Sequence, residues 1–127
     1  MAYIHFHSKE FEKAWVLLNN TNFSSTNYKL RARSLRVRCY YEQSHLDHHL
    51  IKLLKDELQN FRNFIKRSPI ATRIKDLYYN QIKVIMALNK FDPSTQSQSA
   101  FVEKWKSFLE QHPTMAKTWL MKKLADL

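Results

Sequence analysis

Two short runs of the sequence carry side chains that could do chemistry. Residues 29–39, "KLRARSLRVRC", hold five Lys or Arg side chains. Such a run can contact a nucleic-acid backbone, because Lys and Arg neutralise phosphates. Residues 45–49, "HLDHH", place His45 and His49 four positions apart. At that spacing two imidazoles on one helix can share a metal ion.

The histidine run lacks the rest of a metal site. In the zinc-protease pattern a glutamate directly follows the first histidine, and Leu46 stands there instead. No second cysteine or distant histidine completes a tetrahedral ligand set. We therefore expect solvated or capping histidines and no cofactor, with a metal site at His45 and His49 as the alternative.

Other candidates for catalysis are weaker. Cys39 falls on an apolar stripe, which predicts a buried, inert thiol. The close acid pairs, Glu10 with Glu12 and Asp56 with Glu57, are one or two residues apart. Helix neighbours at that separation do not share a face. We expect no catalytic residue and no enzyme, and we expect the three tryptophans in the core.

The basic run fits a helix better than a strand, because its alternation breaks in the middle. On a helix Lys29, Arg33 and Arg36 share one face, and Arg31 and Arg38 share the opposite face. Two apolar stripes separate these faces, so the helix must bury both, with the arginines lining the exits to solvent. The stripes are Leu30, Val37 and Tyr41, and Tyr28, Ala32, Leu35 and Cys39.

Two interpretations of the basic face remain open. It can be the rim of a groove that binds a helix or peptide, with Lys29, Arg33, Arg36 and Tyr40 as candidate binding residues. The alternative is a nucleic-acid-binding helical module that uses the basic patch of residues 29–38. Phosphate binding would require neighbouring helices to add cations on the same side.

Composition favours an all-α chain. The 127 residues contain no glycine, which excludes a phosphate-binding loop or dinucleotide fingerprint and disfavours tight hairpins. The net charge is +10, and residues 28–67 hold ten cations against four acids. A single cysteine, no visible secretory signal and no apolar run long enough to span a membrane lead us to expect the cytoplasm.

Apolar periodicity predicts five to six helices in a single domain, residues 1–127, which we suspect was cut from a longer protein. We expect Ser44 to cap the third helix, with Asp47 three residues later. Pro69 is expected to open the fourth. The predicted helices span residues 8–19, from 25–27 to about 41, 45–66, 69–90, 99–111 and 114–126.

Residues 6–42, "FHSKEFEKAWVLLNNTNFSSTNYKLRARSLRVRCYYE", resemble uncharacterised tetratricopeptide-like helical-repeat proteins of Bacteroidetes type. Phe11 and Ala14 match the aromatic-to-alanine spacing of such repeats, although the usual glycine is absent. The resemblance implies an antiparallel helical array wound as a right-handed α–α superhelix. Its implied role is that of a protein-interaction or scaffold module.

Overall fold

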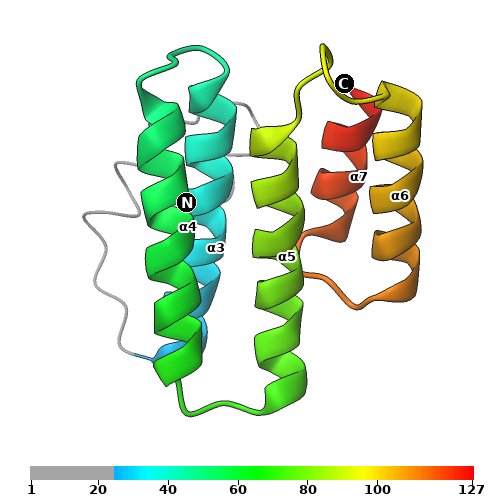
Figure 1. Ribbon diagram of the computed structural model, residues 1–127. Coiled ribbons are helices and arrows are strands. Elements are labelled where there is room, and N and C mark those ends of the chain that lie inside the picture. Colours follow the sequence, from blue (N-terminus) through cyan, green and yellow to red (C-terminus); the bar gives the residue numbers. More distant parts are fainter. Residues whose placement is uncertain (1–24) are drawn as a thin grey trace. The chain divides into compact units, whose positions relative to one another are not determined.

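The structure, a computed structural model, describes residues 25–127 (Figure 1). The helix predicted at residues 8–19 lies outside the described residues. Between residues 25 and 127 the chain forms helices and no β-strand, so the all-α prediction is confirmed. The helices are α3 (Thr26–Ser44), α4 (Leu50–Arg67), α5 (Thr72–Lys90), α6 (Gln98–Gln111) and α7 (Lys117–Ala125).

The chain divides into two compact units, Met1–Pro69 and Ile70–Leu127. The described part of the first unit is a hairpin of α3 and α4, which lie side by side and antiparallel (Figure 1). The second unit holds α5, α6 and α7. The expectation of a single domain over residues 1–127 stays a prediction.

Helix α3 buries both of its apolar stripes, as predicted. Ser25 caps its start, where the side-chain oxygen accepts a hydrogen bond from the Tyr28 backbone N–H at 3.3 Å. Val37 represents one stripe and Cys39 the other, and both are fully buried. Tyr28, in the first turn, is the exception and is 58% exposed. The helical, doubly buried conformation excludes a strand over the basic run.

Helix α4 begins five residues later than predicted, at Leu50. Ser44 is not its cap, because the Ser44 hydroxyl donates to the Tyr41 carbonyl within α3. Asp47 instead accepts from the His49 backbone N–H in the connection. One stripe of α4 is fully buried and supplies the core of the hairpin. Its members are Leu54, Leu58, Phe61 and Ile65.

In the second unit, α5 begins at Thr72, so Pro69 is not its first residue and that prediction was wrong. Helix α7 packs against both α5 and α6 (Figure 1). The core of the second unit is apolar apart from the buried Gln81 and Thr114. Trp105 and Trp119, which we expected in the core, are only half-buried. The buried apolar residues are Tyr78, Ile82, Val84, Ile85, Leu88, Phe101, Leu109, Leu120 and Leu124.

The connection between α6 and α7 is tied to α5. Asn80 donates a side-chain hydrogen bond to the Pro113 carbonyl at 2.9 Å. The Met115 backbone N–H donates to the Leu77 carbonyl at 3.0 Å. Ala116, which precedes α7, has φ 60° and ψ 37°. This left-handed conformation is unfavourable for a residue with a Cβ atom, so the tight turn into α7 is held under strain.

Within residues 25–127 no helix has both the length and the apolar character needed to cross a membrane.

Candidate functional site

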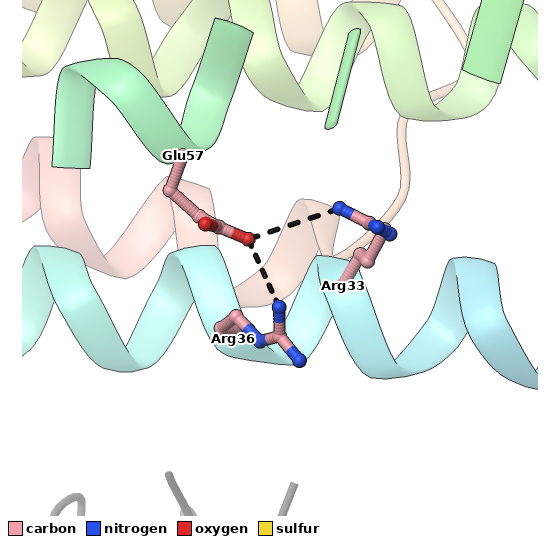
Figure 2. A network of polar contacts seen from close by, with 3 residues as sticks. All are labelled: Arg33, Arg36 and Glu57. Carbon is pink, nitrogen blue, oxygen red and sulfur yellow. Dashed lines mark hydrogen bonds and ion pairs between the residues drawn. The ribbon is translucent and has the colours of Figure 1, made fainter. Parts of the chain in front are cut away.

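Two arginines of α3 converge on one carboxylate of α4 (Figure 2). Arg36 donates from Nη1 to Glu57 Oε1 at 3.3 Å, and Arg33 Nη1 lies 4.0 Å from the same oxygen. The side chains are 30% exposed at Arg33, 23% at Arg36 and 15% at Glu57. A single half-buried acid therefore balances two guanidinium groups.

The register of the hairpin produces this cluster. Arg33 and Arg36 are three residues apart and share the rim of α3. Glu57 precedes the buried Leu58 on α4, which places it at the edge of the helix–helix interface. Glu57 was not predicted as the partner of these arginines, because it is 21 residues from Arg36. Aligning the two predicted helices as an antiparallel pair would have placed Glu57 near the arginines.

Arg33 is held by more than its carboxylate partner. Its guanidinium lies over the Phe64 ring, 4.4 Å from the centroid, a cation–π contact. Burial lowers the pKa of Arg33, nearby Glu57 opposes that shift, and the charges of Arg36 and Arg67 lower it further. Helix α4 thus adds a cation, Arg67, to this side of the hairpin. Sequence reasoning missed both Phe64 and Arg67 as site residues.

Arg36 retains unused hydrogen-bonding capacity. Its Nε atom is buried and has no hydrogen-bond partner among residues 25–127. Its Nη1 shares the Glu57 oxygen with Arg33. A guanidinium has five donors in a planar fork that suits bidentate contact with a carboxylate or phosphate. Because Nε is buried, a second anion can contact Arg36 only through its remaining Nη N–H groups.

The other predicted binding residues lie along the same rim. Lys29 is exposed and Tyr40 is half-buried, and helical spacing sets them in line with Arg33 and Arg36. We call Lys29, Arg33, Arg36 and Arg67 the cationic edge. The structure gives these residues positions, and their role in binding stays a prediction.

The opposite face of α3 differs from the prediction. Arg31 is exposed, but Arg38 is buried, with 8% of its surface accessible. Its Nε atom donates to the Ser34 carbonyl one turn earlier, at 3.4 Å. The expectation that Arg38 lines an exit to solvent was therefore wrong. The long stem of arginine packs well in an interior, and a backbone carbonyl satisfies part of its fork.

His45 and His49 do not stand on one helix. His45 is the residue that ends α3 and His49 the residue that precedes α4, so the helical spacing expected of a shared metal is lost. The His45 ring instead packs edge-on against Tyr41, with centroids 4.6 Å apart. In the described part of the chain no group of three or more His, Cys, Asp or Glu could hold a metal ion.

The Cys39 thiol is fully buried in α3, as predicted. Burial raises its pKa to about 12, and Glu42 adds to that rise while Arg38 opposes it. The thiolate is the nucleophilic form of cysteine. A thiol with so high a pKa stays protonated near neutral pH, so this side chain is chemically silent in the folded chain.

Comparison of the chain with protein-family models, with curated proteins and with solved structures finds no match to any of them. The resemblance of residues 6–42 to tetratricopeptide-like proteins accordingly stays a prediction.

Proposed function

We propose that this chain is a protein-interaction module that binds a helix or peptide along the cationic edge of the α3–α4 hairpin. The observation that supports it best is the sharing of one Glu57 oxygen by Arg33 and Arg36. That sharing leaves the edge with a net positive charge and with guanidinium groups already fixed in place. A partner with acidic side chains complements such a surface.

Apolar side chains beside the edge suit a peptide. Leu53 of α4 is 49% exposed and Tyr40 of α3 is half-buried. Phe64 underlies Arg33 and keeps its guanidinium in position. Peptide-binding grooves combine apolar anchors with a charged rim, and we propose that the cationic edge supplies such a rim in a tetratricopeptide-like array within the cytoplasm. We propose binding and not catalysis as the role of the chain, and the buried, protonated Cys39 thiol is not a nucleophile in it.

The nucleic-acid alternative is less well supported. An acid, Glu57, lies between Arg33 and Arg36 at the centre of the patch. A nucleic-acid backbone presents successive phosphates and needs successive cations along its path, and Glu57 interrupts the cations of this patch. Arg38, one of the cations counted in residues 29–38, is buried. The experiment below keeps nucleic acid as one of its outcomes.

The test compares partner capture by the full chain and by charge variants, with and without nuclease. Lys29→Glu combined with Arg67→Glu should abolish capture, because both replace cations of the edge by acids. Arg31→Glu combined with Arg73→Glu is the matched control, since Arg31 is exposed on the other face of α3 and Arg73 is exposed in the second unit. Capture that survives nuclease and fails only in the edge variant supports the proposal. Loss on nuclease treatment supports the alternative, and equal capture by all variants refutes both.

A further inference from the structure

A cavity of about 400 Å³ lies in the second unit, between the C-terminal end of α5 and the first turns of α6. Gln96 and Ser97 close one side of it, from the connection that joins the two helices. Its volume falls within the range of pockets that bind small organic ligands, about 300–1,000 Å³. The cavity is distinct from the cationic edge, which belongs to the first unit.

One wall of the cavity is aromatic. Phe101 and Trp105 stand one turn apart on α6, with ring centroids 6.4 Å apart. The ring of Phe91, in the connection between α5 and α6, packs against the Phe101 ring with centroids 4.5 Å apart and helps to hold that ring in place. Trp105 is half-buried and keeps part of its indole accessible. A flat ring can stack on the accessible part of the Trp105 indole, and Phe101, whose ring is tilted by 55° to it, can supply an apolar contact beside that ring.

The charged side chains of the cavity all have the same sign. Lys90 at the end of α5 and Lys104 on α6 line it, and no acid does. Neither lysine forms an ion pair with any residue of the described chain, and Lys104 Nζ lies 5.3 Å from the Trp105 ring. Asp92 lies nearby in sequence but accepts hydrogen bonds from the Ser94 backbone and hydroxyl. The cavity therefore favours an anionic group.

We propose that this cavity binds a small aromatic carboxylate. The ring of the ligand stacks on Trp105 and touches Phe101 at its edge, and its carboxylate meets the ammonium groups of Lys90 and Lys104. Both the ring and the carboxylate of the ligand are needed. The aromatic side chains contact the ring, and the two lysines favour a negatively charged group over a neutral one. This site goes beyond the proposed function, which uses other residues in another unit.

The experiment follows the indole N–H signals of the isotope-labelled full chain by NMR, with the Trp105 signal assigned from Trp105→Phe. The probe is 2-naphthoate, and 2-naphthamide is its neutral counterpart. A saturable shift of the Trp105 signal with 2-naphthoate is expected, with affinity for 2-naphthamide at least ten-fold weaker. Equal affinity for the two probes, or a shift of all three indole signals without saturation, overturns the proposal.

Variants locate the site. Lys90→Gln with Lys104→Gln should weaken 2-naphthoate binding at least ten-fold. Lys106→Gln with Lys122→Gln makes the same change of charge at exposed positions outside the cavity and should leave it unchanged. Unaltered affinity in the first pair, or equal loss in both pairs, overturns the assignment. Ala100→Leu, which fills the cavity from a helix surface position, should also weaken binding ten-fold.

Discussion

Replacement of Glu57 by glutamine should destabilise the α3–α4 hairpin by about 2 kcal/mol. The Arg36–Glu57 hydrogen bond, long at 3.3 Å and partly exposed, accounts for about 1 kcal/mol of this. The Arg33 contact at 4.0 Å accounts for about 0.5 kcal/mol. Repulsion between the two arginines, no longer screened by a carboxylate, adds about 0.5 kcal/mol more.

Hydrogen exchange of the α3 amides is the suitable assay, because it reports the local opening of one unit and not the average over both. A loss of about 2 kcal/mol corresponds to exchange about 30-fold faster. Asp56→Asn is the control, since Asp56 is an exposed acid next to Glu57. A double-mutant cycle of Glu57→Gln with Arg36→Met should yield a coupling of about 1 kcal/mol. Exchange in Glu57→Gln no faster than in the control would refute the shared-carboxylate account.

Three further predictions concern other parts of the chain. Burial raises the pKa of Cys39 to about 12 against an ordinary 9.0, so the unfolded chain loses a proton first as pH rises. Between about pH 8 and about pH 10, the free energy of unfolding measured in urea should fall by about 1.4 kcal/mol more in the native chain than in Cys39→Ala. An equal fall in the two chains would contradict the burial of Cys39. Ala116→Gly should slow exchange in α7, with a gain of about 1 kcal/mol from relief of the left-handed conformation; a loss would show that no strain is stored there. Leu58→Ala should cost about 3 kcal/mol in urea, whereas Ile51→Ala, 38% exposed on the same helix, should cost under about 1 kcal/mol; similar costs would mean that the burial is misassigned.

The helices could be predicted because apolar spacing repeats over many residues. The double burial of α3 followed from Val37 and Cys39 lying on different stripes. Helix ends were harder, since they depend on single local hydrogen bonds. Serine is a common N-cap residue, yet the Ser44 hydroxyl donates to the Tyr41 carbonyl and Ser44 is the last residue of α3.

The candidate site could be predicted only in part, because spacing within one helix says nothing of the neighbouring helix. Arg33 and Arg36 share a face through their own separation of three residues. Their partner Glu57 lies on α4, and the pairing of α3 with α4 cannot be predicted from the spacing of residues within either helix. The prediction that Arg38 is exposed was wrong for a related reason. Helical spacing shows which residues share a face, but it does not show which face another segment covers.

The tie between the α6–α7 connection and α5 has a consequence for how the second unit comes apart. Helix α7 has nine residues, too few to persist alone in water. Its entry point is anchored to α5 by Asn80, which reaches a carbonyl 33 residues further along the chain. That long loop must close before α7 gains its contacts with α5, whereas its contacts with α6 need only the short connection between them. Melting of α5 therefore removes one of the two helices that hold α7 and the anchor of its first turn, so the stability of α7 should fall with that of α5.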